Sequence, residues 1–443
     1  MSDMAVAPRA SEAGAAGMRP TRVRHVVLWL TVLAYMITYM DRVVISVTGP
    51  MIQAEYGLSN RSWGWVLGIF QIGYAMFQIP GGWLGDRFGP RRVLTVIVIW
   101  WSTFTALTTA TWNASSLIGC RFLFGCGEAG AFPNATRSLS RWMLPSERGF
   151  AQGLTHAGAR LGAALTPILV VWLMLHFGWR APFLIFAVLG LIWAAVWFWY
   201  YRDSPQQHAS TNDAERRLIA DALAPQGAGG AVTAKVPWRF ILAQPQLWLI
   251  SAMYFCYAYS INIFLTWFPK YLNEVRDFDL AQMGLFASLP LMAGVIGDIT
   301  GGWVSDRLLH RWGHVTLARR VVAVIGFLLA AVAIPAGVLS ASPLVSVAWF
   351  ALAVFGLELT VGVSWALTLD VGGIFAGSVS AVMNTFGNIG GALAAVITGY
   401  ILHWSGWNAA MYVLAALSAI GGLLFLRIDA SRPIYQPGAP SPA

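Results

Sequence analysis

Long apolar runs alternate with short polar segments along the whole chain. Each run covers about 20 residues, the length that an α-helix needs to cross the hydrocarbon core of a bilayer. Transmembrane β-strands would instead alternate apolar and polar residues over about 10 positions. We therefore expect an all-α membrane protein with twelve transmembrane helices, near residues 25–48, 63–84, 92–111, 115–136, 149–175, 181–201, 246–268, 281–304, 318–339, 343–365, 372–399 and 406–427.

Composition supports this interpretation. Of the 443 residues, 57% are apolar and only 11% are charged, which is too little polar surface for a soluble protein. Cys120, Cys126 and Cys256 lie inside apolar runs, so they indicate small buried residues rather than disulfides or a metal cluster. The first apolar run lacks the small-residue cleavage pattern of a secretory signal peptide.

The distribution of basic residues predicts the topology. The net charge is +9, and with the N-terminus inside, the cytoplasmic segments hold 21 of the 28 Lys and Arg residues. The opposite loops hold four, namely Arg61, Arg180, Lys270 and Arg276. This asymmetry follows the positive-inside rule, so both termini are expected in the cytoplasm and the basic charge does not indicate nucleic-acid binding. The strong preference for Arg over Lys suggests a GC-rich bacterial genome and hence a bacterial inner membrane.

The chain contains an internal repeat. The motif Gly81–Arg87 (GGWLGDR) returns 220 residues later as Gly301–Arg307 (GGWVSDR). Two parallel six-helix halves, 25–201 and 245–427, are therefore expected around a central substrate site. A cytoplasmic linker, 202–244, joins them, and Asn212 is predicted to cap a short helix there. Residues 1–24 are expected to form a disordered cytoplasmic tail, and 428–443 a second cytoplasmic tail.

These residues carry a family resemblance. Gly82-x-x-x-Asp86-Arg87-x-Gly89-x-Arg91-Arg92 resembles the loop signature of the major facilitator superfamily. Within it, residues 39–42 (YMDR) and 121–149 are similar to the anion:cation symporters, bacterial proton-coupled importers of galactonate, glucarate, hexuronates and related anions. The resemblance implies that the first and fourth helices face each other across the cavity. It also implies that the two loop motifs act as conformational latches, through Asp86, Arg87, Asp306 and Arg307.

Charged residues inside the predicted spans are the main site candidates. Each costs roughly 2.5–3.5 kcal/mol at the centre of a spanning helix, so it needs a function or a partner. Arg42 and Arg121 are proposed to clamp the substrate carboxylate, because a guanidinium binds a carboxylate through two hydrogen bonds. Asp41 and Glu128 are proposed to carry protons, with Glu128 two helical turns from Arg121. The alternative is a purely structural network of ion pairs.

Polar side chains at helical spacing accompany these charges. Tyr35, Tyr39, Arg42 and Ser46 form one stripe, and Gln71, Tyr74 and Gln78 form another. Asn384 and Asn388 are one turn apart, although they also suit an interhelical hydrogen bond, and Tyr35 also suits the membrane interface. The residues predicted to contact substrate are Arg42, Arg121, Tyr39, Tyr74, Gln71, Gln78, Arg160, Asn384 and Asn388.

Three further charges have open roles. Arg160 follows Gln152 and His156 at four-residue steps, and it suits a third anion contact or a substrate discriminator. Asp298 aligns with Gln78 through the 220-residue offset, but it also lies near a cytoplasmic loop where it can cap or pair. Glu358 lies in mid-span without a visible partner, which fits a secondary proton site or a buried hydrogen bond equally well.

Other motif matches have simpler explanations. Gly125–Gly130 fits G-x-G-x-x-G, but it lies within a predicted membrane helix, so the glycines indicate helix packing rather than a dinucleotide site. Gly158 and Gly162 are likewise a small-residue helix contact. His310 and His314 have metal-like spacing, but they lie in a loop. No arrangement of nucleophile and base suggests an enzyme.

The sequence thus predicts a secondary transporter that imports an organic anion, most specifically a sugar acid such as an aldonate, uronate or aldarate. It is expected to work as a monomer, by proton symport and alternating access, with the proton as coupling ion and no cofactor. Alternatives are a symporter of tartrate or an aromatic acid, a membrane sensor that does not transport, and a membrane enzyme.

Overall fold

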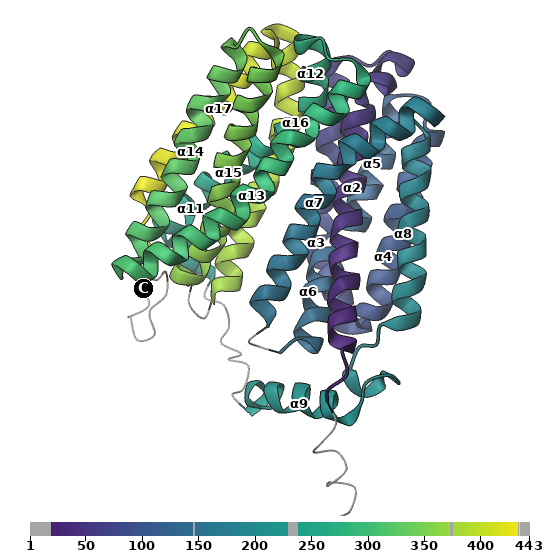
Figure 1. The fold of residues 1–443 in the computed structure, drawn as a ribbon, viewed down its shortest axis with the longest axis vertical. Coiled ribbons are helices and arrows are strands. Elements are labelled where there is room, and N and C mark those ends of the chain that lie inside the picture. The colour runs from purple at the N-terminus through teal and green to yellow at the C-terminus, as the bar shows by residue number, and fades with distance from the viewer. Residues whose placement is uncertain (1–18, 145–146, 229–237, 373–374, 433, 435–443) are drawn as a thin grey trace, which may run out of the picture.

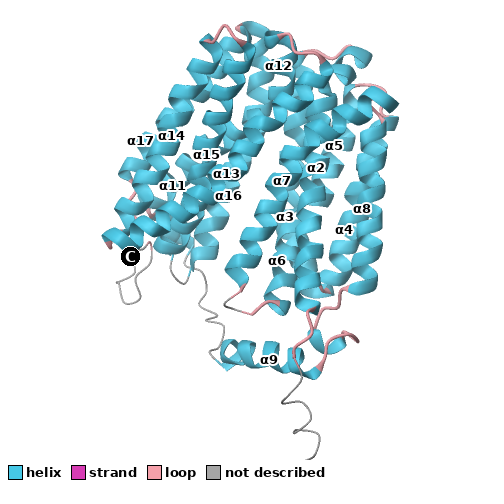
Figure 2. Cartoon of the chain, viewed as in Figure 1, coloured by secondary structure: helices cyan, strands magenta, loops and turns pink. Residues whose placement is uncertain are grey.

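The computed structural model describes residues 19–144, 147–228, 238–372, 375–432 and 434. These residues form helices joined by short loops, and they contain no strand (Figure 2). Helices suit this composition because each satisfies its own backbone hydrogen bonds, which a lipid environment cannot do.

The helices before the linker are α2 (Val23–Tyr56), α3 (Asn60–Phe88), α4 (Pro90–Leu107), η1 (Thr108–Ala110), α5 (Ala114–Glu128), α6 (Ala131–Trp142), α7 (Arg148–Phe177) and α8 (Ala181–Tyr200). The linker holds η2 (Pro205–Gln207), α9 (Asp213–Ala228) and α10 (Trp238–Ala243). The remaining helices are α11 (Pro245–Thr266), α12 (Phe268–Arg276), α13 (Leu280–Trp312), α14 (Val315–Leu339), α15 (Pro343–Gly372), α16 (Ala376–Trp404) and α17 (Gly406–Arg427).

The predicted set of membrane helices is present, with two irregularities. Ten described helices are long and apolar enough to span a membrane. The other two predicted spans are α3, which carries the polar residues Gln71 and Gln78, and the region 115–136. That region is two helices, α5 and α6, rather than the one expected. Pro133 explains the break, because it has no N–H to bond the carbonyl of Ala129.

The helices form two groups that lie side by side (Figure 1). Helices α2–α8 form the first group and α11–α17 the second, and α9 lies across one end, which we call the linker side. The outward faces are apolar, as on α8, where Leu184, Val188 and Ile192 are exposed. Such a surface suits contact with lipid, because all its backbone groups are satisfied within the helix.

The two groups touch at the end opposite the linker, which we call the far side. The Lys270 Nζ donates hydrogen bonds to Gln53 Oε1 at 2.5 Å and to Asn60 Oδ1 at 2.7 Å, joining α12 to α2 and α3. Gly399 of α16 packs against Asn60 so closely that an added Cβ would lie 2.4 Å from the Asn60 carbonyl oxygen. Lys270 was expected in an exposed loop, but α12 extends the helical path and leaves it only 6% exposed.

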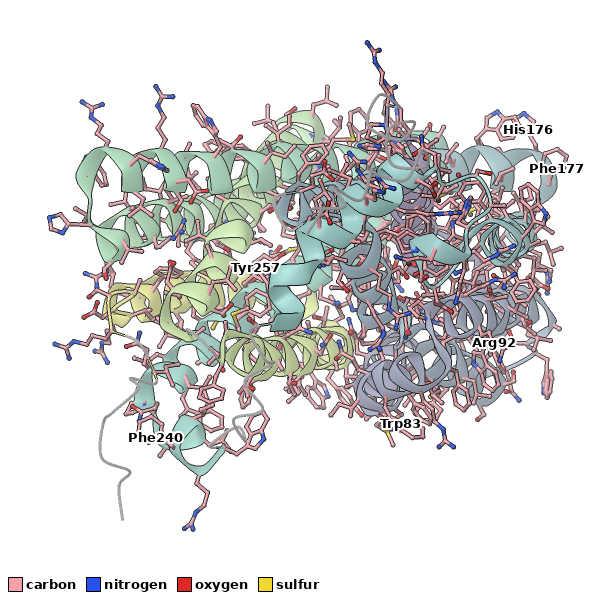
Figure 3. The ribbon with its side chains drawn as sticks, turned by 90° about the horizontal axis from the view of Figure 1, so that it is seen from below. Trp83, Arg92, His176, Phe177, Phe240 and Tyr257 are labelled. Carbon is pink, nitrogen blue, oxygen red and sulfur yellow. The ribbon has the colours of Figure 1, made fainter. Side chains whose placement is uncertain are left out.

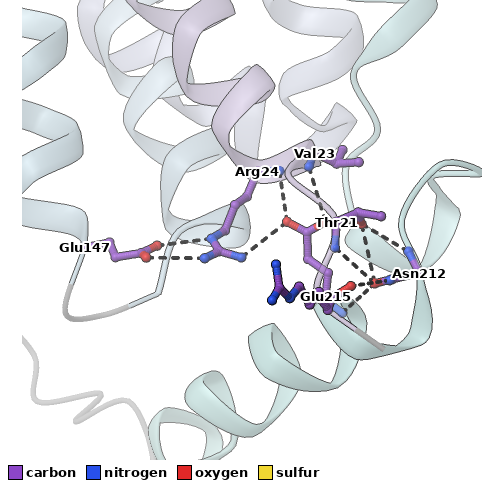
Figure 4. A network of polar contacts seen from close by, with 7 residues as sticks. Thr21, Val23, Arg24, Glu147, Asn212 and Glu215 are labelled. Carbon is purple, nitrogen blue, oxygen red and sulfur yellow. Dashed lines mark hydrogen bonds and ion pairs between the residues drawn. The ribbon is translucent and has the colours of Figure 1, made fainter. Parts of the chain in front are cut away.

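The linker helix is attached to the first group by a polar network (Figure 4). Glu215 is fully buried and accepts hydrogen bonds from the backbone N–H groups of Val23 and Arg24 and from the Thr21 hydroxyl. Arg24 also pairs with Glu147 at 3.3 Å. The carboxylate of Glu215 thus satisfies N–H groups at the start of α2, where an acidic group also complements the helix dipole.

These contacts correct one expectation and bear out another. Residues 1–24 were expected to be disordered, but Thr21 to Arg24 are held by the linker, and residues 1–18 lie outside the described part. Asn212 caps α9 as predicted, because its Oδ1 accepts from the Glu215 N–H at 2.9 Å. In the second predicted tail, Asp429 Oδ1 accepts from the Thr316 hydroxyl at 2.8 Å.

The topology gives a first testable prediction. Ser210 is exposed on the linker side, so S210C is expected to be protected from an impermeant thiol reagent in intact cells and labelled in lysed cells. A341C, in the exposed loop between α14 and α15 on the far side, is the matched control and should be labelled in intact cells. Labelling of S210C in intact cells would contradict the predicted cytoplasmic location of the linker.

Candidate functional site

A cavity of about 940 Å³ lies between the two groups of helices. Its wall includes Arg42 and Arg121 from the first group and Asn384 from the second. It extends toward the linker side, where Thr136 and Leu369 line it. Because the far side is closed by the contacts of Lys270, the cavity is oriented toward the linker side.

All nine residues predicted to contact substrate line this cavity. They come from five helices, so the fold gathers positions that are widely separated in the sequence. These residues are Arg42, Arg121, Tyr39, Tyr74, Gln71, Gln78, Arg160, Asn384 and Asn388. Tyr35 also lines it, which places this tyrosine in the interior rather than at the membrane interface. Their contact with substrate stays a prediction.

Arg42 forms an ion pair with Glu128, which joins α2 to α5. Glu128 is fully buried, and its second carboxylate oxygen has no hydrogen-bond partner among the described residues. The Arg42 guanidinium carbon lies 5.0 Å from the ring centre of Tyr39 and 4.9 Å from that of Tyr74, a distance at which aromatic rings attract a cation. The Arg42 cation is thus paired with one carboxylate, that of Glu128, and the neighbouring rings attract it but carry no net charge.

Arg121 forms no ion pair within the described part of the chain, although Glu128 and Asp41 lie close enough to interact with its charge. Its side chain is 4% exposed, and its guanidinium carbon lies 5.1 Å from the ring centre of Phe70 and 4.8 Å from that of Phe124. Both rings attract the cation, and no described side chain or backbone group accepts a hydrogen bond from its Nε. Burying a cation in this way costs desolvation free energy unless an anion binds next to it and compensates its charge.

Asp41 takes a different position from its neighbour Arg42. It is 1% exposed, it does not line the cavity, and within the described residues neither carboxylate oxygen has a hydrogen-bond partner. Its side chain lies beside Thr105 and Trp101 of α4. The structure therefore brings Arg42 and Glu128 into contact, but it does not pair Asp41 with either arginine.

Arg160 and Glu358 form an ion pair across the two groups. The Arg160 Nη2 lies 2.9 Å from a carboxylate oxygen of Glu358 on α15, a partner that was not visible in the sequence. Glu358 also accepts a hydrogen bond from the Tyr257 hydroxyl of α11, which agrees with the buried hydrogen bond that was one of its two expected roles. Arg160 and Glu358 are 198 positions apart, so no local sequence pattern indicated that they form a pair. Asp298 lines the cavity rather than capping a loop.

The two motifs were expected in loops, but they lie within the ends of α3 and α13 on the linker side, and they differ in detail. In the second, Asp306 pairs with Arg319 of α14 at 2.7 Å, and Arg319 also pairs with Asp370 of α15 at 3.1 Å. In the first, the Arg87 guanidinium stacks over Trp83, and the Asp86 side chain lies outside the described part. Arg307 likewise stacks over Trp303. Latching by these residues stays a prediction, and Arg319 was missed because no motif marks it.

The glycines that were predicted to serve helix packing do lie at close contacts between helices. An added Cβ at Gly125 would lie 2.3 Å from the Phe70 carbonyl oxygen, and one at Gly162 would lie 2.4 Å from that of Met36. Within the described residues, no group of three or more His, Cys, Asp or Glu side chains is placed to hold a metal ion.

Further cavity residues lie on α11 and were not predicted from the sequence. Tyr254, Tyr257, Ala258, Ile261 and Asn262 line the wall at helical spacing. The stripe is visible in the sequence, but its mixture of aromatic and apolar residues resembles ordinary helix packing. Figure 3, seen from the linker side, places Tyr257 among the helices of the second group.

Comparisons with known proteins agree with this architecture. The family model described as Major Facilitator Superfamily matches residues 31–395. A probable sulfoacetate transporter of Cupriavidus necator is 39% identical over 92% of this chain and 94% of its own length. The hexuronate transporter of Bacillus subtilis is 32% identical, covering 89% and 92%.

Solved structures give the same answer for the fold. The crystal structure of a D-xylose-proton symporter superposes with a TM-score of 0.72 at 15% sequence identity, over 91% of this chain and 98% of that one. The protein is a multi-pass membrane transporter and not an enzyme. As its loop signature predicted, the chain belongs to the major facilitator superfamily.

Proposed function

We propose that this protein imports an organic anion together with protons, and that the anion is a sugar acid. The observation that carries the proposal is Arg121, a buried guanidinium on the cavity wall that forms no ion pair with a described residue. An arriving carboxylate would supply the missing charge and accept two hydrogen bonds in one plane. The relatives named as transporters of sulfoacetate and hexuronate support an anionic substrate.

Proton coupling would follow from competition for Arg42. In the empty site the Glu128 carboxylate holds this guanidinium. When Glu128 takes up a proton, its charge no longer competes, and Arg42 becomes available to the substrate beside Arg121. Proton binding thus strengthens anion binding, and by thermodynamic reciprocity the anion strengthens proton binding. Asp41, which is buried and forms no ion pair with a described residue, would be a second proton carrier.

The amide side chains favour a hydroxylated acid. Gln71, Gln78, Asn384 and Asn388 line the same cavity as the arginines. Leaving a buried amide without a partner costs on the order of 1–3 kcal/mol. The hydroxyl groups of an aldonate, uronate or aldarate would satisfy these amides, whereas a benzoate ring would leave them unpaired.

Transport would proceed by rocking of the two helix groups about this site. The contacts of Lys270 close the far side, so release of substrate toward the linker side is the step that this conformation represents. Opening the far side would require Lys270 to separate from Gln53 and Asn60. The pairs made by Arg319 with Asp306 and Asp370 would stabilise one conformation on the linker side.

Counterflow in proteoliposomes tests the proposal. Labelled galactonate or glucuronate is expected to accumulate in vesicles preloaded with the same acid, and other C6 sugar acids should compete, unlike glucose or benzoate. Accumulation also excludes a sensor, which would bind without flux. Efficient competition by benzoate with none by any C6 sugar acid would reject the sugar-acid class.

A second candidate substrate is a short sulfonated carboxylate, which the 39% identical relative favours. In the same assay, competition by sulfoacetate alone would assign this class. It would leave the transport of an organic anion intact.

A further inference from the structure

Three residues from three helices meet at one side of the cavity. The Arg160 Nη2 on α7 donates to the Tyr257 hydroxyl on α11 at 3.2 Å, and this hydroxyl donates to Glu358 Oε1 on α15 at 3.2 Å. Arg160 also forms its 2.9 Å ion pair with the other carboxylate oxygen of Glu358. Each pair of residues in this triad is therefore in direct contact.

The triad is attached to both groups of helices. Arg160 belongs to the first group, and Tyr257 and Glu358 belong to the second. Among the ion pairs of the described residues, the Arg160–Glu358 pair alone connects the two groups. An ion pair at a rocking interface must be exchanged for other contacts when the groups move apart.

Packing fixes the position of Arg160 relative to Arg42. Gly158 and Gly162 flank Arg160, and added Cβ atoms there would lie 2.7 Å from Val32 Cγ1 and 2.4 Å from the Met36 carbonyl oxygen. Helix α7 is thus held against α2, the helix that carries Arg42. Both arginines line the one cavity, so a bound molecule can reach both.

Glu358 lies behind the cavity wall. It is 2% exposed and does not line the cavity, whereas Arg160 and Tyr257 do. Its Cγ packs 3.0 Å from the position of an added Cβ at Gly294 of α13. The carboxylate is therefore paired with Arg160 outside the cavity, and its negative charge competes with an incoming anion for this guanidinium.

We propose that Arg160 and Tyr257 form a second anion subsite, which Glu358 occupies in the empty protein and which the second acidic group of a dianionic organic acid takes over. This inference rests on the proposed function, because the first acidic group is assigned to Arg42 and Arg121. A monoanion leaves the Arg160–Glu358 pair intact and gains nothing there. Glu358 thus acts as an internal competitor that selects for substrates with two charges.

Paired probes that differ by one charge test this subsite. Galactarate and galactonate differ only in a carboxylate against a hydroxymethyl group, and their half-saturating concentrations are measured by counterflow in proteoliposomes. R160Q removes a charge-assisted hydrogen bond to the second carboxylate, so it is expected to raise the half-saturating concentration of galactarate about tenfold or more. The half-saturating concentration of galactonate should rise less than about twofold. R217Q, at an exposed position of α9, is the matched control and should change neither.

Glu358→Gln gives the opposite prediction and does not depend on the stability of R160Q. Glutamine keeps the contact with Tyr257 but removes the competing charge, so galactarate is expected to bind more tightly while galactonate is unchanged. Equal changes for both acids in either variant would assign the pair a purely structural role and overturn the subsite. If the wild-type protein exchanges neither acid nor sulfoacetate, the proposed function itself fails.

Discussion

Replacing Glu128 by Gln is expected to abolish substrate accumulation driven by a pH gradient while leaving exchange intact. Glutamine keeps the size of the side chain and can still accept a hydrogen bond from Arg42, but it cannot take up and release a proton. The accumulation ratio under an inward proton gradient should therefore fall toward 1, because protonation of residue 128 no longer controls the access of substrate to Arg42. Counterflow at equal pH on both sides of the membrane, which needs no net proton movement, should persist.

Glu55→Gln is the matched control for this change. Glu55 also pairs with an arginine, Arg180, but its side chain is 39% exposed at the far side, where such a pair contributes about 0–1 kcal/mol. The E55Q variant should accumulate substrate as the wild type does. If E128Q also concentrates substrate on a pH gradient as well as the wild type, Glu128 does not carry the coupled proton.

The architecture could be predicted because its signals are local or repeated. Apolar runs of span length define the helices, and the repeat of Gly81–Arg87 at Gly301–Arg307 defines the two halves. The stripes on α2 and α3 also place Tyr39 and Gln71 on the cavity side, because helical periodicity fixes which residues share a face.

Features that depend on how two helices are placed relative to each other could not be predicted in this way. The Arg160–Glu358 pair needs the rotation of α7 relative to α15, and no periodicity within either helix contains it. Lys270 was assigned to a loop because hydropathy falls there, yet the polar side chains of Gln53 and Asn60 make its burial favourable. The orientation of Asp41 toward α4 likewise depends on tertiary packing.

The two buried pairs would allow one cavity both to couple protons to the anion and to select the substrate. Arg42–Glu128 lies within the first group of helices, so its state can change without movement of the groups. Arg160–Glu358 joins the groups, so its exchange for a substrate contact changes what holds them together. Breaking a buried pair without a replacement costs about 3–5 kcal/mol. An anion that replaces Glu358 would avoid this cost during the conformational change.

Arg121→Lys is expected to reduce uptake severely although the charge is kept. The guanidinium lies beside the rings of Phe70 and Phe124, which contact each other, and it lines the cavity. A lysine ammonium is compact and strongly hydrated, and it cannot form two parallel hydrogen bonds with a carboxylate. Loss of one charge-assisted hydrogen bond, worth about 1.5–3 kcal/mol, predicts affinity that is about 10- to 150-fold weaker.

Substrate-induced thermal stabilisation and counterflow together test this prediction, since the first reports binding and the second reports transport. R217K is the matched control, because Arg217 is exposed on α9 and should tolerate the same exchange without effect. A general loss of folding would lower the melting temperature of R121K without substrate, whereas a lost clamp leaves that temperature unchanged and removes only the shift that substrate induces. Wild-type affinity in R121K would show that the charge alone suffices and that Arg121 does not hold the carboxylate through paired hydrogen bonds.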